Sequence, residues 1–193
     1  MIPRILVLTG DTAPGSPSAR LALEATRALS LTDVALTGAS LADYPLPFFE
    51  GPGGGEAPQN ARLLAQRLAL QDGLLIALPE INAGPPAALK NALDWVAAAA
   101  DMDRAARPPF ARLVVALASA GSGRGDGRSA LWQVRATLAA LGAEVLTAEF
   151  RLSAAEAAFD AKGRLAESGD RTRLDELVDR LLDTSRALGR QGA

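Results

Sequence analysis

The sequence of 193 residues predicts one α/β domain, residues 1–193, in which helices cover both faces of a parallel sheet. Short apolar runs alternate with longer segments whose apolar residues recur at helical spacing. This alternation repeats five times, and each interval suits a helical crossover between parallel strands. No linker, internal repeat or second domain interrupts it. Hydrophobic residues make up 49% of the chain, enough for a sizeable core. The expected architecture is therefore a doubly wound parallel sheet.

The predicted strands are nearly continuous apolar runs, which are typical of strands buried on both faces. Arg4–Thr9 (RILVLT) is the first, and it ends at a glycine-acid turn. DGLLIAL at residues 72–78 ends at a proline, which cannot continue a central strand. The second and fifth runs are weaker. The five expected strands are Arg4–Thr9, Val34–Leu36, Asp72–Leu78, Arg112–Ala118 and Glu144–Leu146.

The predicted helices carry apolar residues at helical spacing, with start and stop signals. Ser16 or Ser18 can cap the first helix, and Gly142 follows the fourth as its C-terminal glycine. Residues 39–55 and 147–169 are expected to be irregular, and the tail after about residue 189 to be frayed. The expected helices are Ala19–Leu29, Ala57–Leu70, Ala87–Ala100, Ser129–Leu141 and Arg171–Leu188.

The composition excludes several kinds of chemistry. The chain contains no cysteine and no histidine. Disulfides, thiol catalysis, Ser-His-Asp triads, histidine relays and Cys/His zinc sites are therefore ruled out, and no metal site is predicted. Any reaction must depend on a bound cofactor, a carboxylate, a hydroxyl or backbone dipoles.

Charge and hydropathy patterns point to a protein that binds neither nucleic acid nor membranes. The formal net charge is −2, and the arginines are scattered among acidic residues rather than pooled. No apolar run approaches the roughly 18 residues that a membrane helix needs. The run Ile5–Leu8 is too short for a signal peptide. We therefore expect a cytoplasmic location.

Three unusual segments follow predicted central strands. They are Gly10–Ser18, Pro79–Pro86 and Ser119–Arg128, and all are rich in Gly, Pro or Ser. Ligands of open parallel sheets bind beyond the carboxyl ends of the strands, so one ligand is expected to contact all three. The first segment has neither a Walker nor a GxGxxG pattern.

Each candidate residue also has a structural interpretation. The hydroxyls of Ser16 and Ser18, at a helix start, suit either a phosphate or a helix cap. Glu80 can brace its loop or cap a helix. Lys90 and Asp94 have the spacing of a helical ion pair, worth only about 0.3–0.5 kcal/mol. These alternatives remain open at the level of sequence.

The segments Pro79–Asn82 (PEIN) and Leu89–Trp95 (LKNALDW) resemble the signature of the NAD(P)H-dependent FMN reductase family. Its usual pattern is Pro-Glu-Tyr-Asn followed by Leu-Lys-Asn-Ala-Ile-Asp-Trp. Residues 41–47, 119–127, 133–145 and 159–165 are also similar to segments of that family. The family includes quinone, azo-dye and chromate reductases.

The resemblance implies a flavodoxin-like three-layer sandwich with strand order 2-1-3-4-5. It implies bound FMN, which carries hydride from NAD(P)H to a small acceptor in a ping-pong cycle, and no catalytic side chain. It also implies a homodimer or homotetramer, with Tyr44, Phe48, Phe49 and Trp95 as candidate contacts in the core or between subunits. The implied cofactor-binding residues are Thr12, Ser16 and Ser18 for the phosphate, Pro79, Glu80, Ile81 and Asn82 for the ring, and Ser119 and Gly121 for another edge.

Three positions depart from the family pattern. Ala13 replaces the usual phosphate-binding arginine, Asp11 replaces a serine, and Ile81 replaces the tyrosine. Thr12, Ser16, Ser18, backbone amides and Arg20 remain available to a phosphate. The alternative is a flavodoxin-like binding or sensing protein with a weakened flavin site. A phospho-receiver domain is rejected, because the third strand ends in Leu78-Pro79 and no lysine follows the fifth.

Overall fold

A computed structural model describes residues 2–51, 56–102, 107–121 and 126–188. Its five strands are all parallel, and their order, β2-β1-β3-β4-β5, confirms the predicted one. The strands are β1 (Arg4–Thr9), β2 (Ala35–Ser40), β3 (Gly73–Leu78), β4 (Val114–Ala120) and β5 (Glu144–Leu152). The helices are α1 (Pro17–Ser30), α2 (Gln59–Ala69), α3 (Ala87–Met102), α4 (Arg128–Ala140) and α5 (Ser168–Leu188), with a 3-10 turn, η1, at Leu41–Asp43.

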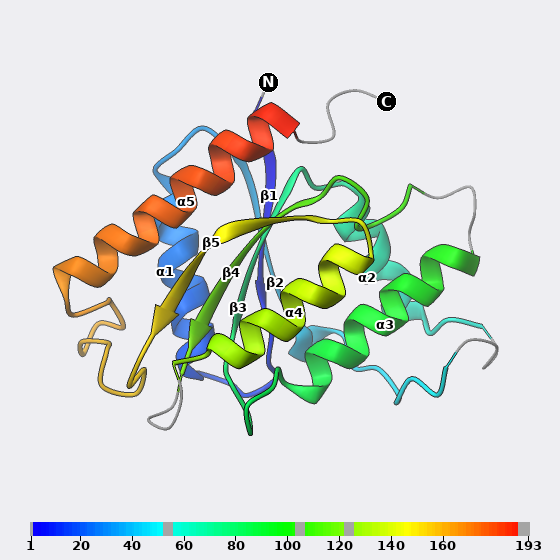
Figure 1. The fold of residues 1–193 in the computed structure, drawn as a ribbon, viewed down its shortest axis with the longest axis horizontal. Helices are drawn as coiled ribbons and strands as arrows, with labels where there is room; N and C mark the ends of the chain where they lie inside the picture. Colours follow the sequence, from blue (N-terminus) through cyan, green and yellow to red (C-terminus); the bar gives the residue numbers. More distant parts are fainter. Residues whose placement is uncertain (1, 52–55, 103–106, 122–125, 189–193) are drawn as a thin grey trace.

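The sheet divides the core into two layers (Figure 1). Because side chains alternate along a strand, Leu6 and Leu8 pack with α2, α3 and α4, whereas Ile5 and Val7 pack with α1 and α5. Every residue of β3 and β4 is buried, as expected for central strands covered on both faces. Loops at the ends of these strands therefore rest on a rigid platform.

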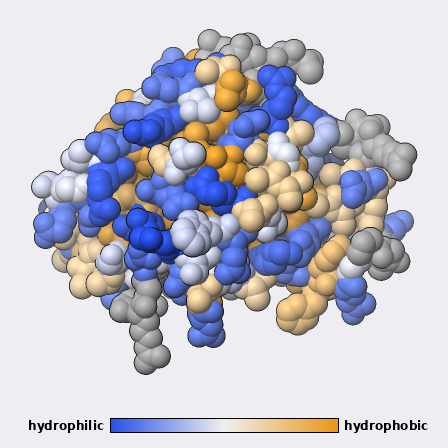
Figure 2. Space-filling view, in the orientation of Figure 1, coloured by the Kyte–Doolittle hydropathy of each residue, from blue (hydrophilic) through white to orange (hydrophobic). Residues whose placement is uncertain are grey.

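Both edge strands are longer than predicted. β2 extends through Ser40, because its residues pair with the whole length of β1 despite weak strand propensity. β5 extends to Leu152, where the sequence predicted an irregular segment after Leu146. A bulge interrupts its pairing with β4, and Arg135 of α4 donates hydrogen bonds to the carbonyls of Val145 and Leu146 there. Figure 2 shows apolar surface between α4 and α5, where this edge strand lies.

The segment between β5 and α5 is fixed by a buried carboxylate. Phe159 and Leu165 pair in an antiparallel bridge, which closes a short turn. Glu24 of α1, 4% exposed, accepts hydrogen bonds from the Nε of Arg164 at 2.7 Å and the backbone N–H of Leu165 at 3.1 Å. These bonds fasten the turn to α1, and the bridge agrees with the hairpin-like segment that the family resemblance implied for residues 159–165.

The predicted frayed tail lies outside the described residues, as do residues 122–125 of the third Gly-rich segment. Among the residues that the structure describes, no helix is both long and apolar enough to span a bilayer.

Candidate functional site

The carboxyl ends of the five strands meet at the lower edge of the sheet in Figure 1, because all strands run in the same direction. The loops after β1, β3 and β4 leave from this edge, as predicted. Hydrogen bonds between elements hold two of them in place: the backbone N–H of Gly10 donates to the carbonyl of Ala77, and Glu80 reaches the start of α4. The edge carries the candidate site.

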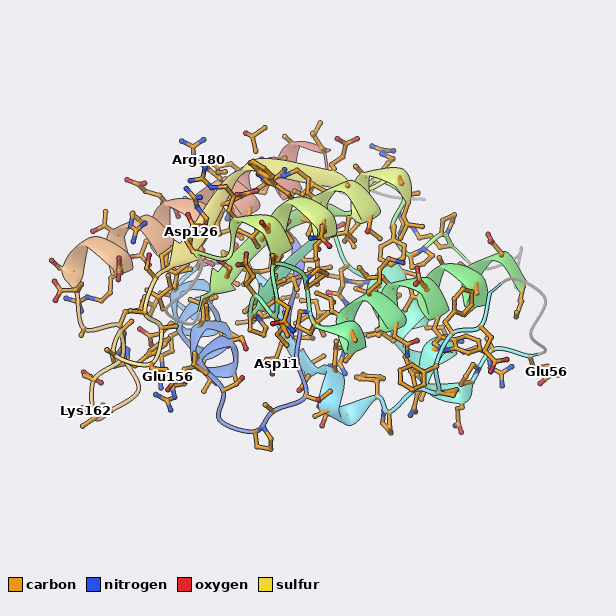
Figure 3. The ribbon with its side chains drawn as sticks, turned by 60° about the horizontal axis from the view of Figure 1, so that its bottom comes forward. Asp11, Glu56, Asp126, Glu156, Lys162 and Arg180 are labelled. Atoms are coloured by element: carbon orange, nitrogen blue, oxygen red, sulfur yellow. The ribbon has the colours of Figure 1, made fainter. Side chains whose placement is uncertain are left out.

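The loop between β1 and α1 contains a buried carboxylate. Asp11 is 7% exposed, and Figure 3 shows it at the start of this loop. Its Oδ1 accepts a hydrogen bond from the Oγ of Ser16 at 3.1 Å, and its Oδ2 accepts one from the Oγ of Ser18. Among the described residues, no arginine or lysine forms an ion pair with Asp11. The two hydroxyls and the positive end of α1 are what stabilise its charge.

The two serines of this loop act as structural donors and acceptors. The Oγ of Ser16 accepts the backbone N–H of Ala19 at 3.1 Å, so Ser16 is the N-cap of α1. Ser18 is fully buried. Each hydroxyl has one hydrogen, and both hydrogens point to Asp11. Ser16 is thus the helix cap that the structural interpretation predicted, whereas Ser18 instead donates to Asp11.

The segment after β3 forms a tight turn. Ile81 and Gly84 exchange two backbone hydrogen bonds, of 2.8 and 3.0 Å, across Asn82 and Ala83. Both central residues have positive φ, 49° and 61°, as in type I′ turns. Asparagine tolerates this conformation, but for alanine it costs about 1–2 kcal/mol. We call residues 79–86 the strained turn.

Contacts with α4 hold the strained turn in place. The carboxylate of Glu80 accepts the backbone N–H groups of Ser129 and Ala130, at 3.1 and 3.3 Å. It thereby caps α4, whose N-cap residue is a glycine. The Nε2 of Gln133 donates to the carbonyl of Ala83 at 2.8 Å. Gln133 is a positioning residue that the sequence reading missed, because its contact is 50 residues away in the chain.

The third loop differs from the prediction. Ser119 was expected in a loop at a ligand edge, but it belongs to β4 and is fully buried. Its Oγ donates to the carbonyl of Asp126. Gly127 packs against this hydroxyl so closely that a Cβ at position 127 would lie 1.9 Å from the Oγ of Ser119. Gly121 is also buried, and its N–H donates to the carbonyl of Leu152. The hydroxyl of Ser119 and the amide of Gly121 are thus used inside the protein.

Charged groups surround the start of α4. Asp126, labelled in Figure 3, pairs with Arg151 at 2.8 Å and with Arg128 at 3.5 Å. The hydrogen bond from the backbone N–H of Arg128 lowers the pKa of Asp126 below its usual range, and the two guanidinium groups add to this while desolvation opposes it. Asp126 therefore stays ionised at the sheet edge.

The LKNALDW segment lies on α3 and anchors the chain that follows η1. Asn91 accepts the backbone N–H of Phe49 and donates to the carbonyl of Pro47, and the indole N–H of Trp95 donates to the same carbonyl. Trp95 is buried and meets Phe49 edge to face. Lys90 and Asp94 form the expected ion pair at 2.7 Å.

A groove of about 380 Å³ lies between this anchored chain and α3, with the first loop at one end. Phe48 projects beside it and is 86% exposed. The groove adjoins the sheet edge and is mainly apolar. It is lined by Thr12, Leu41, Tyr44, Pro45, Leu46, Phe48, Ala87, Ala88, Asn91 and Ala92. A second groove, of about 290 Å³, lies between α2 and the end of α3, away from the predicted site.

Some predicted site residues leave polar groups open. Within the described residues, the backbone N–H groups of Thr12 and Asn82 have no intramolecular acceptor, and both residues are exposed. Ile81 is 52% exposed, although its N–H is used within the turn. The remaining predicted positions, Pro79 and Glu80, are half-buried and support the turn. Thr12, Ile81 and Asn82 are thus the residues most open to a ligand.

A five-stranded parallel sheet of order 2-1-3-4-5, covered by helices on both faces, defines a flavodoxin-like protein. The solved structure of FerB, described as a flavoenzyme NAD(P)H:(acceptor) oxidoreductase from Paracoccus denitrificans, has the same fold. It aligns with a TM-score of 0.75 at 21% identity, covering 97% of this chain and 100% of that one. Residues 3–157 match the family described as NADPH-dependent FMN reductase, and the chain belongs to this family.

Two curated relatives support the same assignment. An NAD(P)H-dependent FMN reductase from Pseudomonas aeruginosa is 31% identical over 125 residues, which is 64% of each chain. An NADPH:quinone oxidoreductase from Arabidopsis thaliana is 33% identical over 129 residues, 64% of this chain and 61% of the relative. The chain therefore spans somewhat less than two thirds of the length of these relatives.

The site fits the two ends of FMN differently. At the strained turn, the open N–H of Asn82 and the exposed Ile81 side chain suit the polar rim and apolar face of a flavin ring. In the first loop, the Asp11 carboxylate takes the hydroxyl hydrogens that a phosphate would need. The strained turn therefore fits the flavin ring, whereas the loop expected to bind the phosphate already contains the carboxylate of Asp11.

Proposed function

We propose that this protein is an NAD(P)H-dependent oxidoreductase that uses a bound flavin to reduce a small acceptor, such as a quinone or a free flavin. The single observation that carries this proposal is the strained turn. It is held open at the sheet edge with a free N–H at Asn82 and an exposed apolar side chain at Ile81. Backbone strain of this kind persists only where surrounding contacts enforce it, and it clusters at ligand sites. Family membership supports the same function.

In this proposal the residues of the chain bind and orient the flavin, and they do not themselves carry out the electron transfer. A bound flavin supplies two-electron transfer, which no side chain in a protein without cysteine or histidine could replace. The backbone N–H of Asn82 would hold the ring edge, and the side chain of Ile81 would contact the ring face. Glu80 and Gln133 keep the turn in the conformation that presents these groups.

We further propose that NAD(P)H and the acceptor use the same position in turn, which is a ping-pong order. Thr12, in the loop after β1, lines the groove beside Phe48, and the apolar lining of this groove suits a flat acceptor such as a quinone. The relatives named as quinone and FMN reductases support this class of acceptor.

Steady-state kinetics test the proposal. Protein loaded with flavin and then freed of excess flavin should oxidise NADPH or NADH, with oxygen excluded, only when a quinone or free flavin is added. Varying both substrates should give parallel double-reciprocal lines, whereas intersecting lines would exclude the ping-pong order. A Gln133→Ala variant should bind flavin more weakly, because the turn loses a brace. Gln66→Ala, which alters the distant groove beside α2, is the matched control.

The alternative is a binding protein without catalytic activity, and the buried Asp11 is the observation that favours it. A preparation that binds no flavin and oxidises no NAD(P)H with any acceptor would establish this alternative. The predicted homodimer or homotetramer stays a prediction, which the mass of the native protein in solution would test.

A further inference from the structure

The first loop already contains the negative charge that a phosphate would bring. Asp11 is almost fully buried, and both of its carboxylate oxygens accept hydroxyl hydrogen bonds from residues that open α1. The N-terminus of a helix stabilises one anion through its dipole and its open N–H groups. In this protein a carboxylate of the chain itself lies at the start of α1, held by the hydroxyls of Ser16 and Ser18.

Counting hydrogens shows what remains for a ligand. Ser16 and Ser18 have one hydroxyl hydrogen each, and both serve Asp11. The contact of 3.0 Å between the two hydroxyl oxygens adds no further donor. The backbone N–H groups of Ala19 and Arg20 are also used, by the Oγ and carbonyl of Ser16. A phosphate at this position would meet no free hydroxyl hydrogen of these two serines. Within the described residues of the loop, the backbone N–H groups without an intramolecular acceptor are those of Thr12, Ala13 and Gly15.

Charges around the loop do not compensate for Asp11. Ala13 carries no charge, and the guanidinium of Arg20 stacks over the ring of Phe159, 5.8 Å from its centroid. Among the residues that the structure describes, Asp11 takes part in no ion pair. A phosphate dianion near it would therefore face like-charge repulsion in a partly desolvated site, where screening is weak.

We propose that Asp11 is a specificity-determining residue that replaces the ligand's phosphate, so that the protein binds flavins through the ring and the sugar chain. It should then bind riboflavin about as well as FMN. This inference rests on the proposed function, and it adds the class of ligand: flavins with or without a phosphate. Within the described residues, the open backbone N–H groups of the first loop and of Asn82 are donors left for such ligands.

Fluorescence titrations of the apoprotein with FMN and with riboflavin test the inference. The wild type should bind the two with dissociation constants within about threefold of each other. Asp11→Ser removes the charge, and it should tighten FMN binding at least about tenfold while riboflavin changes by less than about threefold. Asp33→Asn, which removes an equal charge at the opposite edge of the sheet, should change neither.

Two results would overturn the inference: a wild type that prefers FMN by more than about tenfold, or an Asp11→Ser variant that gains no FMN affinity. If the serine variant does not fold, Asp11→Asn retains the shape and an acceptor and takes its place. Circular dichroism establishes folding in each case.

The effect of inorganic phosphate on the Tm tests the role of Asp11 without any flavin. Phosphate should raise the Tm of Asp11→Ser but leave the wild type and Asp33→Asn unchanged. If no variant binds either flavin, the proposed function fails, and the phosphate measurement still decides the role of Asp11. A rise in Tm confined to Asp11→Ser supports that role, and no rise in Asp11→Ser overturns it.

Discussion

The carboxylate of Glu80 accepts the backbone N–H of Ser129 at 3.1 Å, which joins two segments 49 residues apart in the chain. Through this bond the turn after β3 caps the helix after β4. The two neighbouring loops at the sheet edge therefore form one unit. Residues that hold this unit together should affect stability and ligand binding in the same direction.

Replacing Glu80 with alanine should destabilise the protein by about 1 kcal/mol, as expected for the loss of an N-cap. It should also weaken flavin binding, because the turn that carries Asn82 loses its contact with α4. Urea unfolding and flavin titration measure the two effects. Glu56→Ala is the control, since the Glu56 side chain is 92% exposed. Equal behaviour of the two variants would contradict the bracing role.

Relieving the strain in the turn should stabilise the protein. Ala83 has a φ of 61°, so Ala83→Gly should raise the free energy of unfolding by up to about 1 kcal/mol. Ala154→Gly, with a φ of 48°, should stabilise to a similar extent outside the strained turn. Only the Ala83 change should also lower flavin affinity, because the turn becomes more flexible. If Ala83→Gly leaves the flavin affinity unchanged, the backbone strain at Ala83 does not contribute to flavin binding.

The residues of the LKNALDW segment should differ in their contribution to stability. Asn91→Ala removes two hydrogen bonds to the chain after η1 and should cost about 1–3 kcal/mol. Lys90→Ala breaks only an exposed ion pair and should cost about 0.5 kcal/mol or less. Chemical denaturation compares the two. A larger loss of stability for Lys90→Ala than for Asn91→Ala would contradict this prediction, which is based on the hydrogen bonds of the two residues.

Two aspartates should make opposite contributions to the pH dependence of stability. Hydrogen bonds from the backbone N–H of Arg164 and Lys162 lower the pKa of Asp160, against some desolvation. Its stabilisation is present above the ordinary aspartate pKa and is lost as pH falls through the folded value. Desolvation raises the pKa of Asp175, with help from the charges of Asp179 and Glu24. Its protonated form favours folding, so that stability declines as pH rises above the ordinary value.

Thermal unfolding at about pH 7 and about pH 3 tests both signs. Asp160→Asn should lower the Tm at neutral pH, and Asp175→Asn should raise it. Both differences should shrink toward the acidic pH, because Asp175, with its raised pKa, becomes protonated in both states and Asp160 loses its stabilisation as the pH falls through its lowered folded pKa. A difference of the same sign for both variants would contradict the predicted opposition.

The sequence predicted the central part of the fold because local and tertiary requirements agree there. β1 and β3 are apolar runs buried on both faces, and their starts and ends were placed to within a residue. The end of β5 was missed because Glu149 and Arg151 look like exposed loop residues. In the structure they are paired with Arg135 and Asp126, which come from other elements.

The candidate site was predicted only in part. The sequence located the edge, because carboxyl ends of parallel strands must meet there, and the structure places Thr12, Ile81 and Asn82 on it. It did not reveal that Ser119 and Gly121 lie inside β4 and its end, nor that Gln133 braces the strained turn. These contacts join residues far apart in the chain, and no local pattern encodes them.

The sequence by itself determined the alternation of strands and helices, the parallel sheet and the family signature. Each of these depends on the order and spacing of residues that are close together in the chain. Tertiary structure decided where the carboxylates of Asp11 and Glu80 point: one into its own loop, the other to the start of a distant helix. The physical reason is that a carboxylate is directed by whichever donors the fold brings within reach, and those donors are fixed only when the chain has packed.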